Sequence, residues 1–168
     1  MNYITSDLHF GHENLCRNLR KMTTDECTEL LITNWNKQVS KKDKVWILGD
    51  ITMEKPKLIL EILPLLHGFK HVILGNHDTS PCVSALIQCG CKIDVSVKYH
   101  NLLFTHYPVH PSELAYCSGN VHGHLHCGER INLGPLYYNV NCEFHNYTPI
   151  PFEEVENYFK NLHKNFAL

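Results

Sequence analysis

Apolar and polar positions follow two different periods along the chain, and the period changes near its middle. In the first half, short apolar runs alternate with segments of helical spacing, such as Leu30, Leu31, Trp35 and Val39. In the second half, apolar and polar residues alternate over 92–99. The pattern predicts strands over 1–6, 45–48, 71–74, 92–99, 101–105, 120–123 and 135–140. It predicts helices over 24–39, 81–88 and 152–166, one from 56 to between 64 and 68, and a short one within 11–21.

The order of these elements predicts the fold class. Alternation of strand and helix is typical of parallel strands joined by crossover helices, whereas a run of strands favours a second sheet. We therefore expect an α/β fold with two packed mixed β-sheets flanked by helices, an α/β/β/α sandwich. A length of 168 residues fits a single domain over 1–168. Thr24 is expected to cap the helix that it begins.

Composition narrows the class of protein. The net charge of −2 does not favour nucleic acid or an anionic membrane as a partner. No signal-peptide pattern opens the chain, and no uncharged apolar run approaches the ~18 residues that cross a bilayer, so we expect a cytoplasmic protein without membrane contact. The eight cysteines form no C-x-x-C pair and are expected to be reduced core thiols. Cys89-Gly90-Cys91 could instead form a soft-metal or redox pair.

The thirteen histidines are more unusual, because several follow predicted strands together with carboxylates. Ligands bind outside the carboxyl ends of strands in open α/β sheets, so these side chains are expected to share one site. A single run such as Gly75-Asn76-His77-Asp78 is more often a turn, but the pattern recurs after five predicted strands. The side chains that follow these strands are Asp7 and His9, Asp50, Asn76 and His77, His106, and His124 and His126.

Carboxylate, imidazole and amide ligands suit Mn²⁺ first, with Fe²⁺, Zn²⁺, Co²⁺ or Ni²⁺ as alternatives. There are more ligands than one ion uses, so two divalent ions are expected. Two ions about 3.5–4 Å apart repel each other, and a bridging carboxylate commonly holds such a pair. Asp50 is the candidate bridge.

These motifs, in this order, resemble the signature blocks of the calcineurin-like metallophosphoesterases, and in particular their short bacterial and phage branch. The blocks are Asp7-x-His9, Gly49-Asp50, Gly75-Asn76-His77-Asp78, His106 and Gly123-His124-x-His126. The resemblance implies hydrolysis of phosphate esters by attack of a metal-bound hydroxide. It implies a first ion held by Asp7, His9, Asp50 and His126, and a second held by Asp50, Asn76, His106 and His124. It also implies that Asp50 and His77 are catalytic, with His77 as the acid for the leaving oxygen or a hydrogen-bond donor to phosphate.

The chain departs from the protein-phosphatase members of that family, which continue as Gly-Asp-x-x-Asp-Arg-Gly. Met53 and Glu54 stand where the second Asp and the Arg would be. A histidine without its carboxylate partner is a weaker acid, which favours phosphodiesters of nucleotide-like or small molecules over monoesters. The candidate substrate contacts are His12, Arg17, Asn76 and Tyr107. Asp78 could orient His77 or its loop, or it could cap the following helix.

Two alternatives stay open. A nuclease acting on DNA or RNA would need a basic track beside the site, and its candidates are few: Arg17, Arg20, Lys21, Lys41 and Lys42. A non-catalytic metal-binding scaffold would have no need of His77 as an acid. A small phosphate ester, such as a nucleotide, is therefore the favoured partner.

Overall fold

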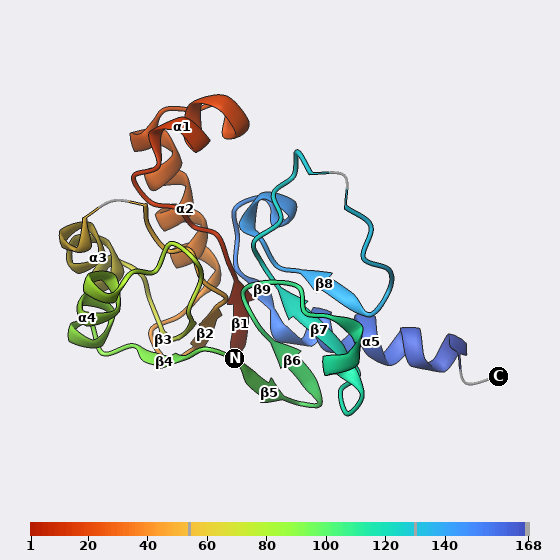
Figure 1. Cartoon of the computed structure of the whole chain (residues 1–168). Helices are drawn as coiled ribbons and strands as arrows, with labels where there is room; N and C mark the ends of the chain where they lie inside the picture. Colours follow the sequence, from red (N-terminus) through yellow and green to blue (C-terminus); the bar gives the residue numbers. More distant parts are fainter. Residues whose placement is uncertain (54, 130, 167–168) are drawn as a thin grey trace.

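Two β-sheets stack against each other in the computed structural model, which describes residues 1–53, 55–129 and 131–166 (Figure 1). The five-stranded sheet has the order β4-β3-β2-β1-β9, and its first four strands are parallel. The four-stranded sheet has the order β5-β6-β7-β8, in which only β5 runs antiparallel to its neighbour. The strands are β1 (Asn2–Thr5), β2 (Lys44–Ile47), β3 (Phe69–Ile73), β4 (Lys92–Asp94), β5 (Val97–Tyr99), β6 (Leu102–Phe104), β7 (Gly119–His122), β8 (Tyr137–Asn139) and β9 (Ile150–Pro151).

Helices cover the outer face of the five-stranded sheet. They are α2 (Thr24–Gln38), α3 (Pro56–Ile62) and α4 (Ser80–Gln88). Leu31, Ile59 and Leu86 of these helices share one buried cluster with Val45 and Ile47 of β2. Alternate residues of a strand point to opposite faces, so this face of β2 belongs to the helices. Shorter helical segments are α1 (Glu13–Leu15), a π-helix (Cys16–Arg20) and 3₁₀ turns over Leu63–Leu65, Pro111–Leu114 and Cys142–His145.

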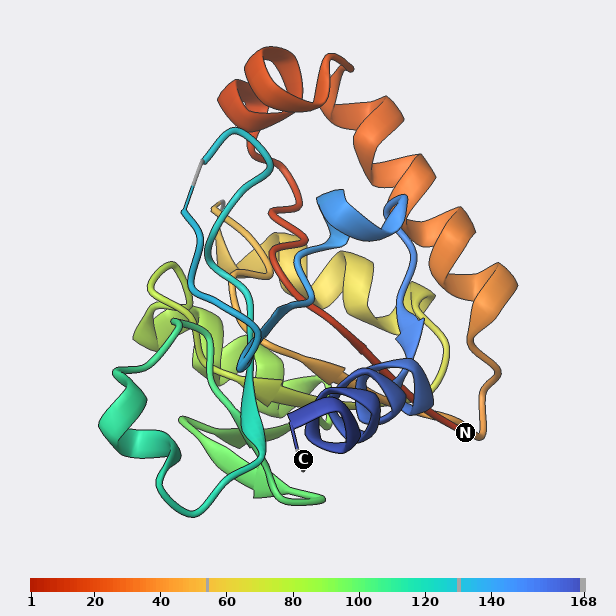
Figure 2. The same cartoon turned by 90° about the vertical axis from the view of Figure 1, so that its right-hand side faces the viewer.

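The second buried cluster lies between the two sheets. Trp46 of β2 faces inward, where it meets Phe104 of β6 edge-on with ring centroids 5.2 Å apart. The long helix α5 (Phe152–Phe166) adds Val155 and Phe159 to the same cluster. In Figure 2, α5 is the dark-blue helix in front of the strands. The predicted architecture, two mixed sheets packed together and flanked by helices, is confirmed.

Three local predictions were wrong or incomplete. The run 92–99 is not one strand: β4 pairs with β3, and the chain then bends and enters the other sheet as β5. Apolar alternation continues through the bend, so it could not reveal the change of sheet. Thr23, not Thr24, caps α2, and it forms a capping box with Glu26. The two-residue strand β9 was not predicted, because it is too short to show a period.

The described cysteines form no disulfide. All eight cysteines lie in the described part of the chain and are free, and Cys16, Cys27, Cys82 and Cys142 are buried. Within residues 1–53, 55–129 and 131–166, no helix combines the length and the apolarity that a bilayer crossing needs.

Candidate metal centre

The side chains that follow the strands meet in two clusters. Asp7, His9 and His126 form the first, and Asp50, His106 and His124 form the second. Within each cluster the possible ligand atoms all lie within 4.8 Å of one another, which fits divalent metal binding. The first cluster combines residues that are up to 119 positions apart in the chain, and the second combines residues up to 74 positions apart. The parallel order of the strands brings them together, because β1, β2, β6 and β7 each lead directly into a ligand segment.

One carboxylate oxygen lies between the two clusters. Asp50 Oδ2 is 3.6 Å from His9 Nε2 and 3.4 Å from His106 Nε2. Asn76 joins the second cluster, since its Oδ1 lies 2.9 Å from His106 Nε2. Burial alone would raise the pKa of Asp50, but its hydrogen bond to His106 and the charge of that ring hold the pKa below its usual value. Asp50 is therefore ionised and placed to face both clusters.

The imidazoles present the nitrogens that a metal would need. His106 Nδ1 donates to the Leu48 carbonyl at 2.8 Å, and His126 Nδ1 donates to Glu143 at 2.9 Å. Each bond turns Nε2 toward the cluster, where a metal ion would take the place of the proton on that nitrogen, as is usual for metal-binding histidines. Both ring nitrogens of His9 are buried without a hydrogen-bond partner among the described residues. Such a group costs about 1–3 kcal/mol, and a metal would supply the missing partner.

The backbone of the ligand segments is strained. Asp7, His9, Asp50 and His124 have φ values of 56°, 48°, 56° and 68°, in the left-handed region that side chains other than glycine rarely adopt. Each such residue costs on the order of 1 kcal/mol or more, and residues of this kind concentrate at functional sites. Asp and His adopt this conformation more often than most other residues, but their presence alone does not predict it.

Two motif glycines are explained by the close approach of ligand side chains. A Cβ on Gly75 would lie 2.2 Å from Asp50 Oδ1, and a Cβ on Gly123 would lie 2.4 Å from Asp7 Oδ2. Only a residue without a side chain leaves these carboxylates in place. The glycines of the motifs therefore belong to the site as much as the ligands do.

Replacement of Gly75 by alanine is expected to displace the Asp50 carboxylate and weaken metal binding by about 10–100-fold, the usual effect of disturbing a ligand's support. Metal content after equilibration with Mn²⁺ would measure it. Gly128→Ala is the matched control, because its Cβ would meet only Leu19 Cδ1, at 3.5 Å. Equal metal content in both variants would contradict the crowding argument.

A buried ion pair supports the first cluster from behind. Arg20 Nε donates to Glu143 Oε1 at 3.0 Å, and both side chains have no exposed surface. The same guanidinium donates to the carbonyls of Asp7 and Leu8, at 2.7 and 3.0 Å. Burial alone would raise the pKa of Glu143, but its hydrogen bond to His126 and the charges of His126 and Arg20 lower it to about 2. Arg20 and Glu143 thus fix the candidate ligands Asp7 and His126.

No sequence motif predicts the role of Glu143, and Arg20 does not lie where a basic track needs it. Arg20 was a candidate for a basic track, but it is buried and cannot contact a nucleic acid. Glu143 lies outside every motif and 123 residues from Arg20, so no local pattern links the two. The Asn141-x-Glu143 segment after β8 gives only a weak signal, that of polar residues following another strand.

Asp78 holds two ligand loops together. Its carboxylate accepts hydrogen bonds from the backbone N–H groups of Asp50, Ile51 and Gly75, at 3.0, 3.2 and 2.8 Å. The residue at the N-terminal cap of α4 is Thr79. The loop-orienting alternative is therefore confirmed, and the helix-capping alternative is wrong.

The other candidate site residues lie at different distances from the clusters. The His77 N–H donates to Asp50 Oδ1 at 3.0 Å, and its partly exposed ring has Nε2 3.8 Å from Asp50 Oδ2. The His12 ring lies 5.6 Å from the His9 ring, and the Tyr107 ring lies 4.5 Å from the His124 ring. Arg17 is exposed and pairs with Glu13 at 2.9 Å, so the structure does not bring it to the clusters.

Met53 and Glu54 occupy the two positions where the chain departs from the phosphatase motif. Met53 is partly exposed, and Glu54 lies outside the described residues.

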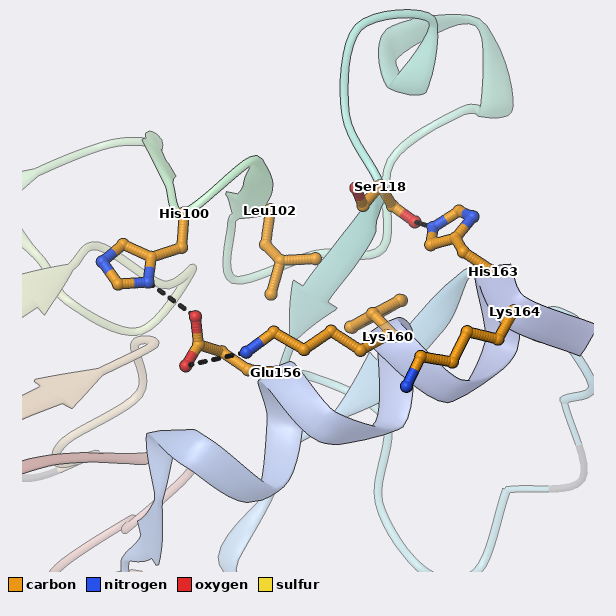
Figure 3. Close-up of a pocket in the computed structure, with 8 residues that line it drawn as sticks. His100, Leu102, Ser118, Glu156, Lys160, His163 and Lys164 are labelled. Atoms are coloured by element: carbon orange, nitrogen blue, oxygen red, sulfur yellow. Dashed lines mark hydrogen bonds and ion pairs between the residues drawn. The ribbon is translucent and has the colours of Figure 1, made fainter. Parts of the chain in front are cut away.

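A separate pocket of about 470 Å³ lies at the opposite end of the four-stranded sheet, beside the first residue of β6 (Figure 3). Several of its polar side chains already have partners. His100 Nδ1 and Lys160 Nζ both contact Glu156, at 2.6 and 3.9 Å, and His163 Nε2 donates to the Ser118 carbonyl. This pocket contains no residue of the two clusters.

Comparison with known proteins places the chain among relatives of similar length. No family model matches it. It is 32% identical over 162 residues to the uncharacterized protein MJ1445 of Methanocaldococcus jannaschii, an alignment covering 90% of this chain and 86% of the relative. It is 30% identical over 155 residues to the gene 66 protein of Mycobacterium phage D29, covering 74% and 77%.

Two solved structures share the fold. The protein of unknown function AQ665 from Aquifex aeolicus matches with a TM-score of 0.71 and 25% identity, over 94% of this chain and 98% of that one. The nuclease MPE of Pseudomonas putida matches with a TM-score of 0.50 and 16% identity, over 74% and 61%. The latter identity is low enough that the likeness concerns the fold alone.

Proposed function

This chain belongs to the family of the M. jannaschii protein MJ1445 and the phage D29 gene 66 protein, and we propose that it is a two-metal phosphoesterase of the calcineurin-like type. The proposal is carried by one observation: Asp50 Oδ2 lies within 3.6 Å of a histidine nitrogen of each cluster. A carboxylate in that position can bridge two cations. The preferred substrates are phosphodiesters of nucleotide-like or small molecules.

The described side chains divide into two ligand sets. Asp7, His9, Asp50 and His126 would hold one ion, and Asp50, Asn76, His106 and His124 would hold the other. Two divalent ions so held neutralise charge on the phosphate oxygens and lower the pKa of a bound water. Carboxylate, imidazole and amide donors suit Mn²⁺, and also Fe²⁺, Zn²⁺, Co²⁺ or Ni²⁺. The Arg20–Glu143 pair keeps Asp7 and His126 in position without touching substrate.

His77 is assigned the role of assisting the leaving group. Its backbone is tied to Asp50 Oδ1, while its ring is partly exposed at the edge of the clusters and free to reach a phosphate ester. Among the described residues, Asp50 is the carboxylate that its ring approaches, at 3.8 Å. A histidine so placed donates a hydrogen bond or a proton to the leaving oxygen. Without a dedicated carboxylate partner it suits leaving groups that need little protonation, which favours diesters.

A nuclease is the second candidate, because the chain shares its fold with the nuclease MPE. A nucleic-acid substrate needs cations along the path of its phosphates. Burial removes Arg20 from that path, and Arg17 is already paired with Glu13. Small diesters are therefore preferred over polynucleotides.

The test compares bis-p-nitrophenyl phosphate with p-nitrophenyl phosphate in the presence of Mn²⁺. The diester is expected to have the higher kcat/KM, and a chelator is expected to stop its hydrolysis. A higher kcat/KM for the monoester would refute the diester assignment. Metal binding without turnover of either ester would instead favour the scaffold alternative.

His77→Ala separates the role of the acid from metal binding. The variant is expected to keep its metal content and to lose about 10²-fold in kcat, the lower end of the usual effect of a general acid, because its leaving groups need little protonation. His163→Ala, on the exposed face of α5, is the matched control. Normal turnover by His77→Ala would show that another group assists the leaving oxygen.

A further inference from the structure

We propose that the pocket beside His126 is the subsite that binds the nucleoside part of a nucleotide diester. This inference rests on the function proposed above and deepens it by naming a substrate class. The cavity, here called the side pocket, has a volume of about 300 Å³ and is lined by residues that include His122, His126, Tyr137 and Phe144. Ligand pockets start at about this size. It is therefore suited to a small aromatic group rather than to a long chain.

The side pocket adjoins the first metal cluster, because His126 belongs to both. Phe144 is the next residue after Glu143, which holds His126 Nδ1 at 2.9 Å. A phosphate bound at the clusters would thus have one of its two ester groups beside the pocket. The pocket is therefore placed to contact that ester group and to discriminate between diesters that carry different groups there.

Two aromatic rings offer surfaces for a nucleobase. The Tyr137 ring is held in place by its hydroxyl, which donates to the Val109 carbonyl at 2.8 Å. The Phe144 side chain is 49% exposed although it is large and apolar. Bases stack on such rings in many proteins that bind single nucleotides or single strands. The exposed part of the Phe144 ring is available to a base that stacks on it.

The pocket also offers groups for the edge of a base. His122 is buried, and its Nδ1 donates to the Gly123 carbonyl at 2.8 Å, which leaves Nε2 to contact a ligand. Asn132 Oδ1 accepts the Gly134 N–H at 3.0 Å, which leaves its NH₂ group as a donor. An acceptor and a donor beside aromatic rings fit a heterocyclic base better than a simple hydrocarbon.

Charge argues against a second phosphate in the side pocket. Glu129 lines it, and among the described residues no Lys or Arg does. A carboxylate repels a phosphate, whereas it tolerates an uncharged base and sugar. The described lining of the pocket therefore suits an uncharged base and sugar.

The experiment compares thymidine 5′-(4-nitrophenyl phosphate) with methyl 4-nitrophenyl phosphate, in Mn²⁺. Both release the same phenol, so a difference in kcat/KM reports on the group that stays on phosphorus. The wild-type protein is expected to prefer the thymidine ester by about ten-fold or more, in line with one stacked base. In Phe144→Ala, the ratio of the kcat/KM values for the two esters is expected to fall about ten-fold. Phe69→Ala, an equally conservative change at an exposed ring in β3, is expected to keep it.

A second readout does not depend on turnover. Thymidine binding to the metal-free protein, measured by calorimetry, is expected to weaken about ten-fold in Phe144→Ala and to be unchanged in Phe69→Ala. Equal hydrolysis of both esters, together with absent thymidine binding, would overturn the subsite and leave the phosphoesterase proposal standing. Thymidine binding that depends on Phe144, with neither ester hydrolysed, would support the subsite and overturn the phosphoesterase proposal.

Discussion

Asp50→Asn is expected to abolish the paired metal site and the diester hydrolysis that depends on it. Asparagine has nearly the same size but carries no charge, so it cannot offset the repulsion of two cations. Loss of a support residue typically weakens metal binding 10–100-fold, and the loss of a shared ligand should exceed about 100-fold. The measurement is metal content by elemental analysis, together with kcat/KM for bis-p-nitrophenyl phosphate.

Asp25→Asn is the control for Asp50→Asn. Asp25 is an exposed residue in the first turn of α2, and its replacement removes the same charge far from the clusters. It should leave metal content and hydrolysis unchanged. Two bound ions in Asp50→Asn would refute the bridging role, even if the rate fell.

The second large effect is expected for stability, from Arg20→Met. The change leaves the Glu143 carboxylate buried without its partner and removes the donors to the Asp7 and Leu8 carbonyls. Breaking one side of a buried ion pair costs about 3–5 kcal/mol of unfolding free energy. Urea denaturation of the chelator-treated protein would measure it, so that bound metal does not mask the loss.

Two further variants test the prediction for Arg20→Met more strictly. Arg17→Met removes the same side chain from an exposed pair with Glu13, and its effect should stay within about 1 kcal/mol. The double change Arg20→Met with Glu143→Gln should cost less than the sum of the single changes, because no unpaired charge remains. Strictly additive effects would mean that the two residues do not depend on each other.

The clustering of the candidate ligands could be predicted from the sequence because chemistry and topology coincide in them. Each ligand segment follows a strand, as with Asp7 after β1 and His106 after β6, and parallel strands deliver their carboxyl ends to a common edge. A pattern repeated in this way is visible without coordinates. The same reasoning gave the helix-flanked pair of sheets.

Other features of the fold and of the site depend on three-dimensional contacts that no short sequence pattern encodes. Glu143 reaches His126 and Arg20 only because the turn after β8 folds back over the π-helix residue Arg20. The division of 92–99 between two sheets depends on which neighbour each half pairs with, not on its own alternation. The sequence could not decide whether Asp78 caps a helix or orients a loop, because both roles use the same residue type.

The left-handed conformation of Asp7, His9, Asp50 and His124 has a consequence for protein engineering. At these positions glycine would relieve the backbone but erase the ligand. A library selected only for heat resistance would therefore accumulate replacements at the residues that the chemistry needs. Activity has to be selected alongside robustness, or the improved variants will be inert.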